Sequence, residues 1–190
     1  MSLDDIDRYI DMSAEELRDE LGSLLDDVEG EVDTLVREHK EDVPRLMDKL
    51  DETDAAEFAN EEPELADRFQ TFLWDLTSEI VAASEELQSQ ITQGATVNFA
   101  ATDSPMEGHL HVDDDAKTLD GGPGQVDGAD LHIEGDSDTL VGMLTGSTDL
   151  VQGFMAGEFE MDGEVDTGME LASVMEPIYD SLGEEGTAEA

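Results

Sequence analysis

Apolar residues recur every three or four positions through the first half of the chain, which is the spacing of one face of a helix. One such stripe predicts a helix over residues 13–39: Leu17, Leu21, Leu24, Val28, Val32 and Leu35. Residues 43–50 predict a second, shorter helix. A third stripe, over residues 65–91, has eight apolar positions and predicts a long helix that Pro63 begins. Residues 51–62 are polar and predict a linker.

Individual side chains refine this helical half. Ser13 and Glu16 have the spacing of a capping box, which begins a helix by satisfying its free backbone amides. Trp74 lies off the stripe of this long helix, so we expect it to contact the amino-terminal helices. The stripe over residues 17–35 needs a partner, which is either the helix over residues 65–91 or another chain.

The second half of the chain changes to a period of two, which is typical of strands with one buried face. Four segments alternate in this way: 96–101, 108–113, 130–134 and 158–162. In the last of them, Phe159 and Met161 point to one side and three carboxylates to the other. Residues 120–130 hold four glycines and a proline, and they predict a loop.

Helix signals return after the third of these strands. Asp136 and Asp149 each precede a short apolar run and predict helix starts, whereas Gly146 and Gly157 follow those runs and predict helix ends. A last helix is predicted from residue 165 onward, with Pro177 restarting or kinking it.

Residues 144–171 resemble the carboxyl-terminal half of the sterol carrier protein 2 family. Members of that family carry a Thr-Gly pair, a Phe-Met-x-Gly turn and a strand that ends in glycine before a final helix. These motifs stand here as Thr145-Gly146, Phe154-Met155-Ala156-Gly157 and residues 159–163. The resemblance extends over roughly residues 60–182. Outward positions of the strand are acidic here, where the family usually has basic residues, so the departures concern surface partners more than the fold.

The resemblance and the periodicity lead to one expected architecture. The fold class is α+β, with a five-stranded, mostly antiparallel sheet, helices on one face and an amino-terminal helical extension. Residues 1–60 form the extension, a helical hairpin and a candidate surface for homo-oligomers. Residues 61–182 form the domain similar to sterol carrier protein 2, and residues 183–190 are expected to be a disordered tail. The resemblance implies an apolar tunnel between the sheet and the helices.

Charge is the unusual feature of the composition. The chain has 52 acidic and 8 basic residues, for a formal net charge of −44, yet 38% of its residues are hydrophobic, as in ordinary globular domains. Acidity spread along the whole chain favours adaptation to molar salt, as in halophilic archaea, because salt screens the repulsion. Without a basic stripe, the sequence excludes binding to nucleic acid.

Other function classes lack their signals. The chain has no cysteine, no apolar run of about 18 residues that could span a membrane, and no signal peptide in its first residues, so we expect a cytoplasmic protein. No catalytic or phosphate-binding motif appears, and we predict neither catalysis nor a cofactor. His109 and His111 share one face of a strand and leave a metal site as a remote alternative.

The leading hypothesis is a non-catalytic carrier that holds a fatty acyl, isoprenoid or sterol-like lipid in that tunnel. The alternative is a protein-interaction or oligomerisation module with a collapsed pocket. The candidate ligand-binding residues are apolar side chains expected to point inward, among them five methionines, a residue suited to adaptable surfaces. They are Phe99, Leu110, Val112, Leu131, Ile133, Met143, Leu144, Phe154, Met155, Phe159, Met161, Met169, Leu171 and Met175.

Overall fold

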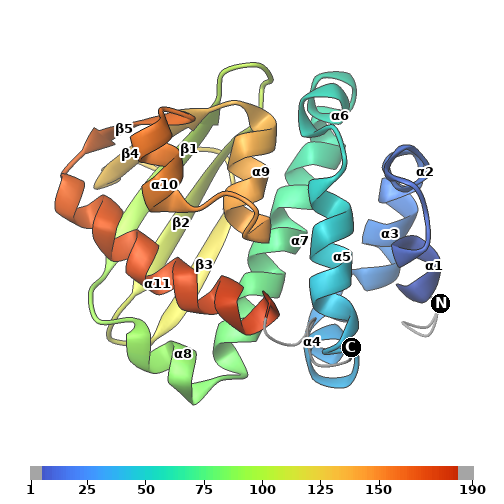
Figure 1. Ribbon diagram of the computed structural model, residues 1–190, viewed down its shortest axis with the longest axis horizontal. Coiled ribbons are helices and arrows are strands. Elements are labelled where there is room, and N and C mark those ends of the chain that lie inside the picture. Colours follow the sequence, from blue (N-terminus) through green and yellow to red (C-terminus); the bar gives the residue numbers. More distant parts are fainter. Residues whose placement is uncertain (1–5, 184–190) are drawn as a thin grey trace.

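The computed structural model describes residues 6–183 and has the predicted α+β fold (Figure 1). Helices cover one face of a five-stranded sheet, and further amino-terminal helices lie beyond them, away from the sheet. Residues 184–190, which belong to the predicted disordered tail, lie outside the described residues.

The sheet has the strand order β3-β2-β1-β4-β5. Its strands are β1 (Ala95–Ala101), β2 (Glu107–Asp113), β3 (Thr118–Pro123), β4 (Leu131–Gly135) and β5 (Phe159–Gly163). Strands β1 and β4 are parallel and the other neighbours are antiparallel, as expected for a mostly antiparallel sheet. The prediction of a loop over residues 120–130 was wrong in its first part, because residues 118–123 pair with β2 as an edge strand.

The helices of the amino-terminal half are α1 (Ile6–Ile10), α2 (Ala14–Asp19), α3 (Leu21–Val28), α4 (Val32–Glu38), α5 (Asp42–Asp51), α6 (Ala55–Glu61), α7 (Pro63–Ala82) and α8 (Glu85–Gln90). The single helix predicted over residues 13–39 is therefore three helices, with Gly30 at a φ of 75° between the last two. The predicted linker contains α6, which the Asp54 side chain caps. The longest helix ends at Ala82, and Ser84 caps α8.

The remaining helices are α9 (Ser137–Thr145), α10 (Leu150–Ala156) and α11 (Val165–Gly183). Asp136 and Asp149 cap α9 and α10 as predicted, and Gly146 and Gly157 end them with φ values of 90° and 75°. Pro177 lies inside α11, which continues through it.

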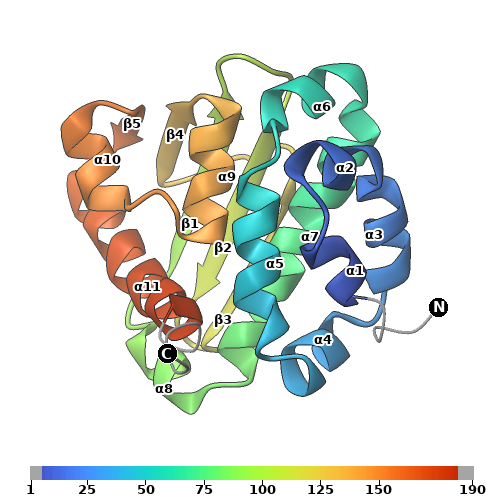
Figure 2. The same cartoon turned by 45° about the vertical axis from the view of Figure 1, so that its right-hand side comes forward.

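Helix α7 is the shared wall of the two halves of the molecule. It packs against β3 on the side of the sheet, and α3, α4 and α6 pack against it on the side of the amino-terminal helices (Figure 2). The apolar stripe of residues 17–35 is buried inside the chain, with Leu17, Leu21, Leu24 and Leu35 at 0% exposure. Its partners thus lie within the same chain, and buried residues of both halves form one continuous core.

Helix α5 ties the amino-terminal helices to α9. The Thr145 and Ser147 hydroxyls both donate to Asp51 Oδ1, at 2.9 and 2.7 Å. Next along the chain, the backbone amide of Ala55 donates to Asp138 Oδ1 at 2.9 Å. These bonds fix α9 against the extension.

Candidate functional site

A small apolar cavity lies between α7, α9 and the helix-covered face of the sheet. Its volume is about 20 Å³, enough for about one water molecule. Its lining residues are Gln70, Trp74, Phe99, Met106, Glu107, Gly108, Leu140, Val141 and Leu144.

Two glycines of the sheet make room for the α7 side chains of the cavity. A Cβ on Gly121 of β3 would lie 2.5 Å from the Trp74 ring, and a Cβ on Gly108 of β2 would lie 2.5 Å from Gln70 Oε1. Trp74 also packs on Phe99, with ring centroids 5.8 Å apart. The expectation that Trp74 contacts the amino-terminal helices was therefore wrong, since the tryptophan faces the sheet.

Gln70 is the polar residue of this cavity. Its side chain is 95% buried, with 5% exposed, and its Nε2 has no hydrogen-bond partner among the described residues. Buried polar atoms normally have partners. Thr77, one turn past Trp74 on the same helix, follows that rule, because its hydroxyl donates to Leu73 O at 2.8 Å.

Contacts from α11 position the α9 wall. The Tyr179 hydroxyl donates to the backbone oxygen of Met143. Burial raises the pKa of this hydroxyl, which therefore stays protonated. The Tyr179 ring packs on Gly146, where a Cβ would lie 2.8 Å from it. Leu140, Val141 and Leu144 of α9 are thus held at the cavity from the α11 side.

The structure places the fourteen predicted ligand-binding residues in three groups. Nine are buried: Leu110, Val112, Leu131, Ile133, Met143, Leu144, Phe159, Leu171 and Met175. Phe99 and Met161 are half-buried. Phe99 and Leu144 belong to the cavity lining, whereas Leu110 and Val112 of β2 fill the core beside it.

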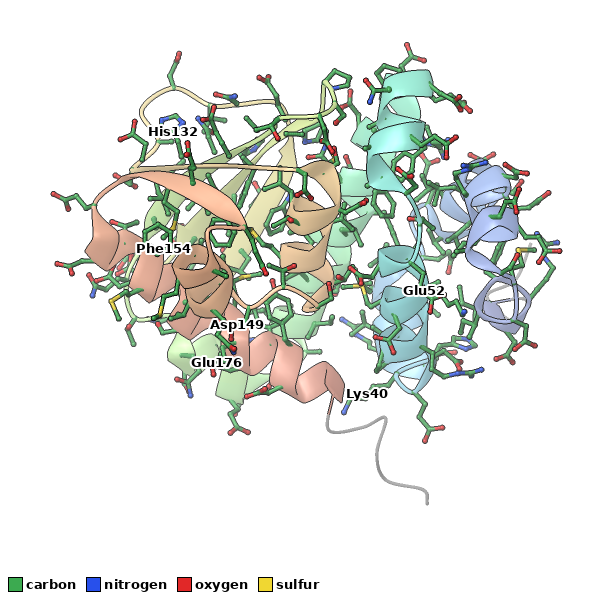
Figure 3. The ribbon with its side chains drawn as sticks, turned by 45° about the horizontal axis from the view of Figure 1, so that its top comes forward. Lys40, Glu52, His132, Asp149, Phe154 and Glu176 are labelled. Carbon is green, nitrogen blue, oxygen red and sulfur yellow. The ribbon has the colours of Figure 1, made fainter. Side chains whose placement is uncertain are left out.

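Three predicted residues do not point inward. Phe154, Met155 and Met169 are 40%, 82% and 62% exposed, so the inward placement expected for them was wrong (Figure 3 shows Phe154 on α10). Helix α10 turns Gly153 toward β5, where a Cβ would lie 2.7 Å from the Phe159 ring. This close approach fixes which face of α10 is buried and leaves the opposite face to solvent.

Sequence reasoning missed most of the cavity wall. Gln70 and Trp74 of the lining are four residues apart, so they form a second stripe on α7 beside the apolar one. This stripe faces the sheet, while the stripe predicted from residue 65 onward meets the amino-terminal helices, with the Phe58 and Phe69 rings 5.2 Å apart. Two stripes on one helix were the available signal of a helix buried from two sides.

The outer face of the sheet carries His109 and His111, the two histidines of the metal alternative. His109 Nδ1 lies 2.9 Å from the backbone oxygen of Gly124, and His111 Nδ1 lies 3.0 Å from Thr96 Oγ1. Among residues 6–183, no group of three or more His, Asp or Glu side chains could hold a metal ion. The metal alternative thus lacks a ligand set in this part of the chain.

A comparison with protein families matches residues 79–176 to the SCP-2 sterol transfer family, just over half of the chain. The chain belongs to the SCP-2 sterol transfer family. The match begins inside α7, so it includes the sheet and α8 to α10 and leaves the amino-terminal helices outside. No curated protein matches this SCP-2 family chain.

Several solved structures are distantly similar. The UbiJ-SCP2 ubiquinone synthesis protein is 14% identical with a TM-score of 0.47, over 58% of this chain and 95% of that one. Sterol carrier protein 2 from Yarrowia lipolytica is 13% identical with a TM-score of 0.43, over 59% and 93%. The sec-alkylsulfatase Pisa1 from Pseudomonas is 18% identical with a TM-score of 0.43, over 56% of this chain and only 16% of the sulfatase. The family assignment rests on the sequence match.

No helix of residues 6–183 combines the length and the apolar character needed to cross a membrane.

Proposed function

We propose that this SCP-2 family protein is a non-catalytic carrier that holds an apolar ligand between its sheet and its helices. The family match supports a lipid-binding role, and the single structural observation behind it is the apolar cavity bounded by α7, α9 and the sheet. Each methylene moved from water into such a site contributes about 0.8 kcal/mol, so a fatty acyl, isoprenoid or sterol-like molecule binds through burial alone.

The cavity is too small for such a ligand, so binding couples to movement of a wall. A volume of about 20 Å³ is far below the 300–1,000 Å³ or so of ordinary ligand pockets. The wall formed by Leu140, Val141 and Leu144 belongs to a nine-residue helix, whereas α7 is packed from both sides. We therefore assign the opening movement to α9, which has to break the hydrogen bonds that Asp51 and Tyr179 make with this segment.

Mass spectrometry of protein purified in high salt tests the carrier. We expect a co-purified lipid, and we expect Leu144→Trp, which fills the cavity, to remove it. Met155→Trp adds the same ring to an exposed position and is the matched control. Circular dichroism establishes that both variants are folded. Wild-type protein that is always empty, and that takes up no added lipid, refutes the proposal.

The second candidate is an interaction module with a collapsed pocket, and the small cavity volume is the observation that favours it. The apolar surface open to a partner then consists of the exposed side chains on α10 and α11: Val151, Phe154, Met155 and Met169. An empty oligomer in the same experiment, dispersed by Met155→Glu, supports this module in place of the carrier.

A further inference from the structure

The unpartnered amide of Gln70 differs from the other buried polar groups of the described chain. Asn98 also carries a buried amide, but its Nδ2 donates to Val126 O at 2.9 Å and its Oδ1 accepts from Val126 N at 3.0 Å. Thr53, Thr77 and Ser137 likewise have partners. Gln70 alone has a side-chain donor, Nε2, that is buried without an acceptor among residues 6–183.

The local backbone accommodates this amide in particular. Any residue other than glycine at position 108 would clash with Gln70, because its Cβ would lie 2.5 Å from Gln70 Oε1. Position 108 belongs to the inward row of β2, with Leu110 and Val112 beside it along the strand. The glycine at position 108 therefore leaves room for the Gln70 amide and for the cavity that Gln70 lines.

The surroundings of the cavity define what could accept the hydrogen bond. Apart from Gln70, its walls are mostly apolar, and none of its nine lining residues is basic. Glu107 is the only charged residue among them. An ionised carboxylate or phosphate placed here would lack a counter-charge, which strongly opposes its desolvation. The Glu107 carboxylate itself is exposed and accepts from Gln125 Nε2. An uncharged oxygen avoids the desolvation penalty.

We propose that Gln70 is a ligand-binding residue that donates from Nε2 to an uncharged carbonyl or hydroxyl oxygen of an otherwise apolar lipid. This inference rests on the proposed carrier function and names its ligand class. The present volume of the cavity fits such a polar group, and the apolar chain occupies the space that α9 opens. A bound water on Nε2, with no role in ligand binding, is the competing explanation.

Headspace gas chromatography with methyl nonanoate and decane, two volatile probes of similar length, tests the assignment. The ester carbonyl supplies an acceptor and the alkane does not. In wild-type protein both probes are depleted from the vapour. In Gln70→Met, which keeps the length and removes the donor, the ratio of ester affinity to alkane affinity falls about fivefold, the worth of one ordinary hydrogen bond.

Thr77→Val is the matched control, because it also removes a buried polar group from α7 but one whose partner is its own helix. We expect it to leave the ratio unchanged. Thermal unfolding establishes that both variants fold, and Gln70→Met should be at least as stable as wild type, since it removes an unsatisfied donor.

Failures of the two proposals differ. If both probes bind and the ratio of ester affinity to alkane affinity is the same in wild type and Gln70→Met, Gln70 donates no hydrogen bond to the ester. Only this inference is then refuted. If the nonanoate anion binds more tightly than its methyl ester at neutral pH, the uncharged ligand class is wrong. If neither probe binds wild-type protein, the carrier function itself is refuted, and the inference with it.

Discussion

Replacing Asp51 with alanine tests whether the amino-terminal helices hold the cavity wall in place. Asp51 ends α5, and its Oδ1 accepts hydrogen bonds from the hydroxyls of Thr145 and Ser147, on either side of the end of α9. The side chains of Thr145 and Ser147 have no other link to α5 among the described hydrogen bonds. Asp51 is thus the side chain through which the extension holds the end of α9.

Two opposing effects set the size of the change. Each hydrogen bond to a charged group contributes about 1.5–3 kcal/mol when buried, and less here because Ser147 is exposed. Against this, burial and then repulsion from Asp51 raise the pKa of the neighbouring Asp48. Removing the charge of Asp51 therefore relieves some repulsion. The net loss is about 1–2 kcal/mol, which lowers the melting temperature by about 2–8 °C for a chain of this size.

Thermal unfolding followed by circular dichroism measures this loss. The measurement belongs in about 1 M KCl, where the Debye length is about 3 Å and long-range repulsion is screened. Glu52→Ala is the matched control on the next residue, because its exposed pair with Lys49 contributes little (Figure 3 shows Glu52). Asp51→Ala and Glu52→Ala with equal melting temperatures would refute the role given to Asp51.

Three further predictions follow from charge and packing. The melting temperature should rise steadily with KCl, because the chain has 52 acidic and only 8 basic residues and salt screens the repulsion among its carboxylates. A melting temperature that does not change with salt contradicts this. At low ionic strength, the midpoint of urea unfolding should rise as the pH falls from 7 toward 4. Burial, and then neighbouring carboxylates, raise the folded-state pKa of Asp75. Its stabilising contribution is therefore complete below the ordinary pKa of 3.8 and is lost as the pH rises through the folded value; a midpoint that falls on mild acidification opposes this. Gly121→Ala should cost about 1–3 kcal/mol and change the fluorescence of the single tryptophan, because its Cβ would lie 2.5 Å from Trp74. In Gly122→Ala the nearest atom would be 3.6 Å away, so equal effects of the two would refute the packing.

Local chemistry explains which elements the sequence could predict. Asp136 and Gly146 bound α9 because a carboxylate satisfies the first free amides of a helix and a glycine adopts positive φ at its end. Both signals depend only on neighbouring residues, and both were confirmed. Strand β3 was missed because residues 121–123 are Gly-Gly-Pro, a typical turn sequence, and only the pairing with β2 makes them a strand.

The cavity could be predicted less well, for a reason that Gln70 illustrates. A glutamine between apolar helical positions is normally exposed, so its type alone indicates no site. What gives it a place at the cavity is Gly108, which is 38 positions away and becomes its neighbour only through the packing of α7 on the sheet. Met155 shows the converse, since its motif resembles the family while its 82% exposure is set by Gly153 packing on Phe159.

Helix α7 lies partly outside the family match, yet it supplies two of the residues that line the cavity. The match begins at residue 79, whereas Gln70 and Trp74 lie before it. Their positions depend on the far side of α7, where Phe69, Leu73 and Leu76 are at 0% exposure in the core shared with the amino-terminal helices. Rotation of α7 would expose these apolar side chains, so the extension fixes the orientation in which Gln70 faces Gly108. The amino-terminal helices thus act on the cavity through α7, which packs against both the helices and the sheet.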